Sequence, residues 1–364
     1  MKIILYIIST LKKTGPVNVL YNIVKDLDRT KYEPVILTLS KEPEGSIKNK
    51  FEELNIRCYC QDLKGLKGYL DARKIKKIVN DISPNIIHAH CFRSILFTAF
   101  YLKKYKTIAT IHCDYDIDFV MAYGYFLGKI MSYLMDWSLK KIKLKISVSE
   151  LLNNILTNKK NYELSFVNNG IDTERFKPTE NKVKLRHKLK LPLNKKIFIW
   201  VGVMIERKNP LLLINAIKQL HTDRIFVFCG DGNLFSEIKE ATKELNNVIL
   251  TGNVDNIDEY FQASDYYIST SLSEGLPMSV IEAMSCGLPV IISDIEQHKY
   301  VLKENSGMLY KTGDTDDLIS KIRDILNVDY NLYSSCARES AKKYFSSNLM
   351  SKNYQTKYEE LLLR

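Results

Sequence analysis

The sequence predicts an α/β protein of two doubly wound units, each a parallel sheet covered by helices on both faces. Short apolar runs of strand length alternate with helix-length segments over residues 2–168 and again over residues 197–326. Such alternation is typical of parallel strands joined by crossover helices. Between roughly residues 172 and 196 the pattern lapses into polar and basic residues with two prolines. This lapse and the length of 364 residues predict two units rather than one.

In the first unit, the expected strands are short apolar runs: residues 2–8, 33–39, 85–90, 107–112, 146–148 and 165–168. The helices expected between them are residues 16–27, 46–54, 69–80 and 93–104. The first of these helices has an apolar face at helical spacing, formed by Val17, Leu20, Val24 and Leu27.

In the second unit, the expected strands are residues 197–201, 224–229, 248–251, 265–270 and 288–292. The expected helices are residues 209–220, 234–245, 277–286 and 316–326, followed by a helical tail over residues 338–364. Pro277 suits the first turn of its helix because the missing N–H would be unpaired there. We expect Gly287 to end that helix in a left-handed conformation.

The composition limits which cellular compartment and which binding partners are expected. Seven cysteines without a Cys-x-x-Cys pair indicate free thiols in a cytosolic protein. No apolar run reaches 18 residues, so no transmembrane helix is predicted. Residues 1–170 hold 27 of the 53 basic and 16 of the 42 acidic residues, and therefore carry the whole net charge of +11. This asymmetry suggests an anionic partner such as phospholipid, a pyrophosphate lipid or nucleic acid, or simply a soluble Lys-rich surface.

The helix that starts near Pro277 follows the strand at residues 265–270 and so begins at the carboxyl edge of the sheet. Amide groups at such a helix start form an anion site suited to a phosphate. Two carboxylates bracket this start, Glu274 before the turn and Glu282 about two turns along the helix. A nucleotide diphosphate-sugar has the matching shape, with a phosphate flanked by groups rich in hydroxyls.

Glu274 and Glu282 are eight positions apart, Gly-Leu-Pro follows the first, and Ala-Met-Ser-Cys-Gly-Leu-Pro-Val covers residues 283–290. This pattern resembles the donor site of retaining GT-B glycosyltransferases of family 4, also called glycosyl transferases group 1, of the bacterial surface-polysaccharide type. The resemblance implies two Rossmann-like domains facing across a cleft, with a C-terminal helix that crosses back to the first domain. The domains expected are residues 1–170 with the tail at about 345–364, a linker at 171–195, and residues 196–344. A short helix near residues 183–190 is also expected.

Other stretches match the same family with departures. Gly15 precedes the first helix where the family usually has two glycines, and a generic strand–helix turn is an equal alternative. In the stretch from Gly202 to Pro210, Val203 replaces the usual Arg, whereas Lys208-Asn-Pro matches. Arg207 can supply the missing charge from a neighbouring position. His112 matches the family's Thr-x-His, whose His lies near the donor sugar.

The resemblance implies transfer of a sugar from a UDP- or GDP-linked donor to a lipid-linked or saccharide acceptor, as in lipopolysaccharide, capsule or exopolysaccharide assembly. The implied catalytic residues are Glu274, His112 and Lys208. The implied donor-binding residues are Gly15, Gly202, Arg207, Lys208, Glu274, Gly275, Leu276, Pro277, Met278, Ser279 and Glu282. No cofactor and no metal are expected. The alternating acids Asp114, Asp116 and Asp118 lack the glycine and glutamate of a calcium loop.

Two alternatives stay open: a GT-B nucleotide-sugar epimerase, and a non-catalytic subunit that binds nucleotide-sugar or lipid. A nucleic-acid partner is not expected, because the basic residues show neither aromatic interleaving nor a known module. The expected location is cytoplasmic, peripheral on the inner face of the cytoplasmic membrane. Residues 119–145 are rich in Met, Tyr, Leu and Ile and end in four lysines. This stretch is either a helix that dips into the membrane interface or a core helix with a basic end.

Overall fold

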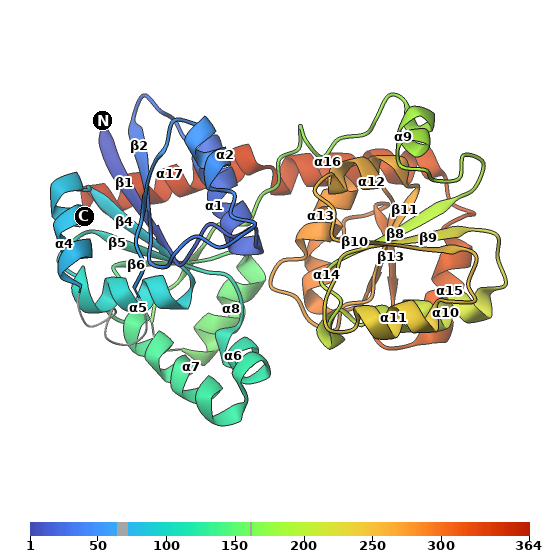
Figure 1. The fold of residues 1–364 in the computed structure, drawn as a ribbon, viewed down its shortest axis with the longest axis horizontal. Helices are drawn as coiled ribbons and strands as arrows, with labels where there is room; N and C mark the ends of the chain where they lie inside the picture. The colour runs from blue at the N-terminus through green and yellow to red at the C-terminus, as the bar shows by residue number, and fades with distance from the viewer. Residues whose placement is uncertain (64–71, 161) are drawn as a thin grey trace. The chain divides into compact units, whose positions relative to one another are not determined.

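The computed structural model describes residues 1–63, 72–160 and 162–364, which form two compact units (Figure 1). The N-terminal unit contains Met1–Gly170 and Ser347–Arg364, and the C-terminal unit contains Ile171–Ser346. Each unit is a parallel sheet with helices packed on both faces. The predicted α/β, doubly wound fold class is therefore confirmed.

Seven strands form the sheet of the N-terminal unit within the described residues, in the order β3-β2-β1-β4-β5-β6-β7, and every neighbouring pair is parallel. These strands are β1 (Lys2–Ile8), β2 (Tyr32–Thr38), β3 (Arg57–Cys60), β4 (Ile86–His90), β5 (Thr107–Ile111), β6 (Leu144–Ser147) and β7 (Ser165–Phe166). The helices are α1 (Gly15–Lys25), α2 (Lys48–Glu53), α4 (Arg73–Ile82), α5 (Cys91–Tyr101), α6 (Tyr115–Tyr123), α7 (Tyr125–Leu139), α8 (Glu150–Lys159) and α17 (Ser347–Leu363).

Alternate side chains of β1 enter two separate cores. Ile4, Tyr6 and Ile8 pack against α1 and α17 on one face of the sheet. Leu5 and Ile7 pack against α4 and α5 on the other face. A strand buried on both faces has no polar positions, which explains the unbroken apolar run at residues 3–8.

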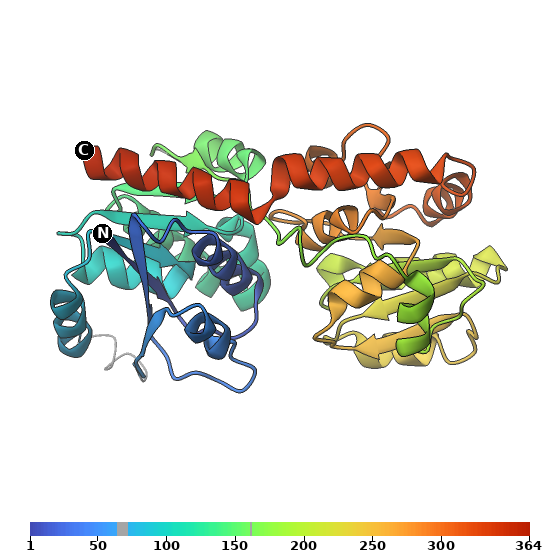
Figure 2. The same ribbon diagram turned by 90° about the horizontal axis from the view of Figure 1, so that it is seen from above.

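Helix α17 belongs to the N-terminal unit although the C-terminal unit precedes it in the chain (Figure 2). It lies against α1, where the Ser351 hydroxyl donates to the Ile23 carbonyl at 2.8 Å. Its two tyrosines reach the sheet: Tyr358 hydroxyl lies 3.0 Å from the Tyr6 hydroxyl, and Tyr354 hydroxyl lies 3.1 Å from Thr110 Oγ1. The predicted return of the C-terminal helix to the first unit is confirmed.

The sheet of the C-terminal unit has the order β10-β9-β8-β11-β12-β13, again with parallel pairs. Its strands are β8 (Ile197–Val201), β9 (Ile225–Cys229), β10 (Val248–Gly252), β11 (Tyr266–Ser269), β12 (Val290–Ser293) and β13 (Gly307–Tyr310). Its helices are α9 (Lys182–Lys188), α10 (Pro210–Leu220), α11 (Phe235–Ala241), α12 (Ile257–Ala263), α13 (Met278–Ser285), α14 (Glu296–Val301), α15 (Thr315–Asp324) and α16 (Tyr330–Phe345), with a 3-10 turn at Glu206–Lys208.

Several predicted elements differ from the structure. The edge strand β3 was not predicted, because its side chains are half exposed and its sequence has no apolar run. Strand β13 and helices α8, α12 and α14 were also not predicted. Residues 69–71 of the helix predicted at 69–80 lie outside the described residues, and α4 continues that prediction to Ile82.

The stretch at residues 119–145 forms two helices and then a strand. Gly124, at φ +79°, separates α6 from α7. Residues of α7 such as Met135 and Leu139 are buried, whereas residues 121–127 are all exposed. The interpretation of this stretch as a core helix therefore holds for the second half of α7 and not for residues 121–127. No helix in the described part of the chain is both long and apolar enough to cross a membrane.

Residues 171–195, expected as a linker, lie within the C-terminal unit. Arg186 on α9 is buried and donates to Asp265 Oδ2 at 2.7 Å. Its other N–H groups donate to three carbonyls, those of Ala263, Leu193 and Lys195, at 2.9–3.0 Å. Asp265 also accepts from the Ile197 N–H at 2.8 Å, so this buried pair fastens the segment to the first residues of β8 and β11.

We expect Arg186→Ala to lower the free energy of unfolding of the C-terminal unit by about 3–5 kcal/mol, because it leaves the Asp265 charge buried with fewer partners. Urea denaturation at neutral pH measures this change. Lys188→Ala is the matched control on the same helix: it removes a partly exposed pair with Glu259 and should cost less than about 1 kcal/mol. A loss no larger than the control's would contradict the structural importance of the Arg186–Asp265 pair.

Candidate active site

The strand order of the C-terminal unit reverses between β8 and β11, which are neighbours in the sheet. Loops that follow neighbouring parallel strands leave from the same edge, and the point of reversal opens a crevice between them. The loop after β8 contains Arg207 and Lys208, and the loop after β11 contains Glu274. The fold therefore brings Glu274 to two residues that lie 66 and 67 positions before it in the sequence.

Glu274 lies between two cations. Its side chain is 7% exposed, and Oε1 contacts the Lys208 ammonium and accepts from the Ser271 hydroxyl at 2.6 Å. Oε2 lies 3.3 Å from Arg207 Nη1, which also donates to the Ser273 carbonyl at 2.7 Å. The predicted grouping of Arg207, Lys208 and Glu274 is thus present within one unit.

The charge of Glu274 is set by these neighbours. Burial alone would raise the pKa of the carboxyl, but Lys208, Ser271 and Arg207 outweigh burial and hold the pKa below its usual range. Glu274 is therefore ionised at neutral pH. A buried carboxylate of this kind is stable only while its cations stay in place.

Hydrogen bonds between the two loops fix the position of the cations. Thr270 Oγ1 donates to the Lys208 carbonyl at 2.8 Å and accepts from Trp200 Nε1 at 3.1 Å. The Leu272 N–H donates to the Arg207 carbonyl at 2.8 Å. Both loops are thus connected to each other and to β8, which preorganises the charged groups.

Helix α13 starts beside Glu274. Pro277 is its N-cap rather than a residue of its first turn, and the Pro277 carbonyl accepts from Val280 and Ile281. Met278 and Ser279 hold the first two amides of the helix, which have no intrahelical carbonyl to bind. Gly287 ends the helix at φ +76°, as predicted.

Four further donor-site candidates lie on or just before α13. Glu282 is four residues, or just over one turn, beyond Met278 rather than the two turns expected. Leu276 is buried in the core beneath the helix, and Gly275 is half-buried beside Glu274. The Ser279 hydroxyl lies 2.8 Å from the Tyr267 hydroxyl, which anchors the start of the helix to β11.

Gly230 and Gly232 allow the loops after β8 and β9 to pack closely, whereas a Cβ on Gly202 would lie 3.2 Å from the Trp200 ring. A Cβ on Gly230, which has φ +145°, would lie 1.9 Å from the Gly202 carbonyl oxygen. A Cβ on Gly232 would lie 2.4 Å from the Met204 carbonyl oxygen. These glycines are explained by backbone contact between the two loops.

The N-terminal unit contains the other two candidates, Gly15 and His112. Gly15 opens α1, and a Cβ there would meet no described atom within 4 Å, so local packing does not require glycine. His112 follows β5, and its Nε2 lies 3.2 Å from His90 Nδ1. Burial lowers the pKa of His112 to about 4, so the ring is neutral at pH 7.

His88 and His90 lie buried on β4 beside His112. His88 bonds the Tyr358 hydroxyl at 2.9 Å and Thr110 Oγ1 at 2.7 Å, which is a structural arrangement. His90 contacts His112 directly and was not predicted to act in the site. The alternation His-Ala-His at the end of a strand could have indicated that both rings share a face.

Ser271 and His298 are also absent from the predicted site residues. The run Ser269-Thr270-Ser271 after a buried strand is the signal that could have identified Ser271. His298 is buried and bonds Ser293, whose hydroxyl donates to the Ser271 carbonyl at 2.6 Å. These residues support the loop that carries Glu274.

The acids that follow His112 are engaged with lysines. Asp114 pairs with Lys159 at 2.6 Å, and Asp116 pairs with Lys160 at 2.7 Å. Over residues 1–63, 72–160 and 162–364, no group of three or more His, Cys, Asp or Glu side chains is arranged to hold a metal ion.

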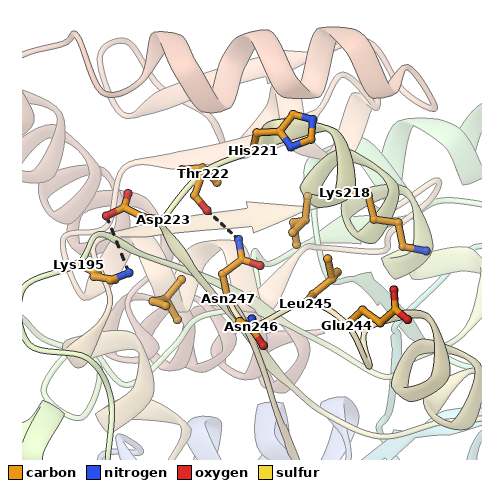
Figure 3. Close-up of a pocket in the computed structure, with 11 residues that line it drawn as sticks. Lys195, Lys218, His221, Thr222, Asp223, Glu244, Leu245, Asn246 and Asn247 are labelled. Carbon is orange, nitrogen blue, oxygen red and sulfur yellow. Dashed lines mark hydrogen bonds and ion pairs between the residues drawn. The ribbon is translucent and has the colours of Figure 1, made fainter.

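A pocket lies at the opposite edge of the C-terminal sheet, lined by the residues drawn in Figure 3. Lys195, Asp223 and Asn247 precede β8, β9 and β10, so this pocket is at the amino ends of the strands. Its polar groups pair with each other: Lys195 with Asp223 at 3.9 Å, and Asn247 with the Thr222 carbonyl at 3.2 Å. Ligands of doubly wound sheets bind at the carboxyl ends, so the pocket is not the candidate site.

Two family models match the chain. The model described as "Glycosyl transferases group 1" matches residues 181–343, and the model described as "Glycosyltransferase Family 4" matches residues 14–175. A UDP-Gal:alpha-D-GlcNAc-diphosphoundecaprenol alpha-1,3-galactosyltransferase of Escherichia coli is 35% identical over 171 residues, with 44% of each chain covered. The O-antigen biosynthesis glycosyltransferase WbnH of Escherichia coli is 29% identical, with 45% of this chain and 46% of the relative covered. The chain spans about half the length of the curated relatives it matches.

Solved structures extend the likeness to the whole fold. Anabaena Alr3699/HepE in complex with UDP superimposes with a TM-score of 0.83 at 18% identity, covering 99% of this chain and 100% of that one. The same protein in complex with UDP-glucose gives 0.83 at 19% identity with the same coverage. Together the two family models span both units, and the fold is that of the GT-B enzymes. The chain belongs to the family 4 glycosyltransferases.

Proposed function

We propose that this protein transfers a sugar from a nucleoside-diphosphate sugar to a lipid-linked saccharide, with retention at the anomeric carbon. The observation that carries the proposal is the buried, ionised Glu274 held by Lys208 and Arg207 at the start of α13. This arrangement places cations, free amides and a carboxylate that can accept from a hydroxyl within one crevice. Cations and amides can bind the diphosphate of a nucleotide diphosphate-sugar, and the carboxylate can bind a hydroxyl of its sugar.

The cations can bind a diphosphate without releasing Glu274. A lysine ammonium has three donors and an arginine guanidinium five, so each has donors left after binding the carboxylate. Lys208 and Arg207 also remain partly exposed, at 16% and 28% of their side chains. We assign to them, with the amides of Met278 and Ser279, the diphosphate of the donor.

The carboxylates bind the hydroxyl groups on either side. Ser271, Lys208 and Arg207 occupy three of the roughly four lone-pair sites of Glu274, which leaves one for a sugar hydroxyl. Glu282, further along α13, is assigned to the ribose. Gly202 and Gly275 keep the adjacent backbone close to the ligand.

Negative charge builds on the departing diphosphate as the glycosidic bond breaks. Lys208, Arg207 and the amino end of α13 stabilise that charge, so the proposal requires no metal ion or cofactor. His112 is the candidate of the N-terminal unit for the reacting sugar, as a neutral ring that can donate or accept a hydrogen bond. We assign no protein nucleophile.

The acceptor and the location are inferred from charge and from the relatives. Residues 1–170 carry the excess of basic residues, which suits an acceptor with a pyrophosphate. The name of the Escherichia coli relative includes a diphosphoundecaprenol acceptor and a UDP-sugar donor. These support a lipid-linked acceptor at the inner face of the cytoplasmic membrane, in the assembly of a bacterial surface polysaccharide.

The first test is thermal unfolding in EDTA with UDP, GDP, ADP and their common sugar conjugates. Stabilisation by one nucleotide is expected, by about 2.7 kcal/mol at a hundred times its Kd. No shift with any nucleotide would instead indicate a non-catalytic subunit that binds a different ligand. Release of free sugar from the donor with no acceptor present would indicate an epimerase.

Variants separate the two roles. Lys208→Ala should lower turnover about 10²–10³-fold, because it removes charge from the leaving group. Glu282→Ala should mainly raise the Kd for the donor by about tenfold or more, because one charge-assisted hydrogen bond is lost. Glu296→Ala, an exposed acid on α14, is the control and should change neither. An unchanged donor affinity in Glu282→Ala would remove Glu282 from the ribose site.

The ionised Glu274 also predicts a pH dependence of stability. Because its pKa is lower in the folded protein than in the unfolded chain, its contribution is complete above the ordinary Glu range and disappears as pH falls through the folded pKa. Glu274→Gln should therefore be less stable than wild type at pH 7, and this difference should shrink in acid. Urea unfolding of both proteins between pH 7 and pH 3 measures it. A difference that does not vary with pH would contradict the assigned ionisation.

A further inference from the structure

Helices α6 and α7 form a hairpin on the periphery of the N-terminal unit (Figure 1). Gly124 makes the turn, and Gly128 lets the helices touch, since a Cβ there would lie 2.6 Å from the Val120 backbone. The inner face of α7 is buried through Ser132, Met135 and Leu139. The hairpin is therefore a rigid part of the unit rather than a loose loop.

The outer face of this hairpin is apolar. Eight of the nineteen exposed large apolar side chains of the described residues fall between positions 117 and 133. They are Ile117, Met121, Tyr123, Tyr125, Phe126, Leu127, Ile130 and Tyr133, which we call the hairpin surface. Phe126 is 85% exposed, and residues 121–127 are all exposed without one charged side chain. Contiguous apolar groups of this kind mark a surface that binds a partner.

The charges around the hairpin surface are cationic. Lys129 lies on α7 within it, and Lys140, Lys141 and Lys143 follow α7. These four lysines are exposed and make no salt bridge to any residue that the structure describes. Of the three acids of the hairpin, Asp116 and Asp136 pair with Lys160, and Asp118 is half-buried and bonded to the Cys113 thiol.

We infer that the hairpin surface inserts into the interface of an anionic phospholipid bilayer. Apolar and aromatic side chains with flanking lysines are the groups that bind at the boundary between headgroups and acyl chains. Tyr123, Tyr125 and Tyr133 combine an apolar ring with a polar hydroxyl, which suits that boundary. The helices have 9 and 15 residues and are too short to cross, so the hairpin rests in one leaflet.

Charge selects the bilayer over a second copy of the chain. Residues 1–170 have a net charge of +11, so two N-terminal units repel each other, whereas an anionic leaflet attracts each of them. The inference rests on the proposed function in one respect, because a lipid-linked acceptor is held in that leaflet. The hairpin would bring the N-terminal unit to its acceptor.

Sedimentation of the full chain with vesicles tests the inference. Wild type should bind vesicles of phosphatidylethanolamine with phosphatidylglycerol more strongly than vesicles of phosphatidylcholine alone, and less so at high salt. Tyr125→Ser combined with Phe126→Ser should lower the partition coefficient tenfold or more, because both rings leave the interface. Leu332→Ser is the matched control, since Leu332 is 45% exposed on α16, and it should bind like wild type.

Equal binding by the double variant and wild type would overturn the inference, as would no binding by wild type. A dimer in vesicle-free ultracentrifugation that the double variant dissolves would assign the surface to a second copy and also overturn it. Phe126→Trp gives an independent measurement that does not depend on loss of binding. Its added fluorescence should be quenched by brominated acyl chains, and absence of quenching would contradict insertion.

The nucleotide-induced thermal shift separates this inference from the proposed function. The double variant should keep that shift, because the hairpin lies in the N-terminal unit and the donor-site residues in the other. A shift without vesicle binding leaves the transferase proposal standing and removes the membrane surface. Vesicle binding without a thermal shift would keep the membrane surface and remove the transferase proposal.

Discussion

Strands β8 and β11 are hydrogen-bonded neighbours although the chain forms β9 and β10 between them. Consecutive parallel strands are joined by crossover connections. In this sheet the strands are added first on one side of β8 and then on the other, so the order reverses at one point. There the loops after β8 and β11 leave the same edge of the sheet and are hydrogen-bonded to each other. Arg207, Lys208 and Glu274 meet because of this reversal, and the loop hydrogen bonds of Thr270 and Leu272 hold them in register.

Two buried acids at opposite ends of β11 show how the same chemistry serves stability and function. Asp265, just before the strand, is saturated by Lys182, Arg186 and the Ile197 N–H. Three further N–H groups of Arg186 donate to carbonyl groups. Glu274, after the strand, is bound by cations that are partly exposed and have donors to spare. The buried Arg186 therefore serves the fold, whereas Arg207 and Lys208 keep donors that can bind a ligand.

The sequence was sufficient for the fold class and for the grouping of Lys208 with Glu274, because strand periodicity and the Glu-Gly-Leu-Pro turn are local signals. It was insufficient for Arg186, since a basic residue in a polar segment looks solvated until Asp265 is placed beside it. His90 was undervalued for the same reason, because its contact with His112 joins two strands. The predicted start of the helix at Pro277 was one residue early, because the N-cap depends on which carbonyl accepts from the following amides. In these cases the structure depends on contacts between residues far apart in the sequence rather than on local conformational preference.

The assignment of α17 to the N-terminal unit has a consequence for biosynthesis. Translation delivers the C-terminal unit as one continuous segment, which can fold as soon as it has left the ribosome. The N-terminal unit, although made first, must wait with the part of its sheet that α17 covers exposed, until Tyr354 and Tyr358 meet Thr110, Tyr6 and His88. The later-made half is thus the first that can be finished, and the nascent chain carries an exposed apolar sheet face for as long as translation of 176 further residues takes. Chaperone dependence during synthesis should concentrate in that interval.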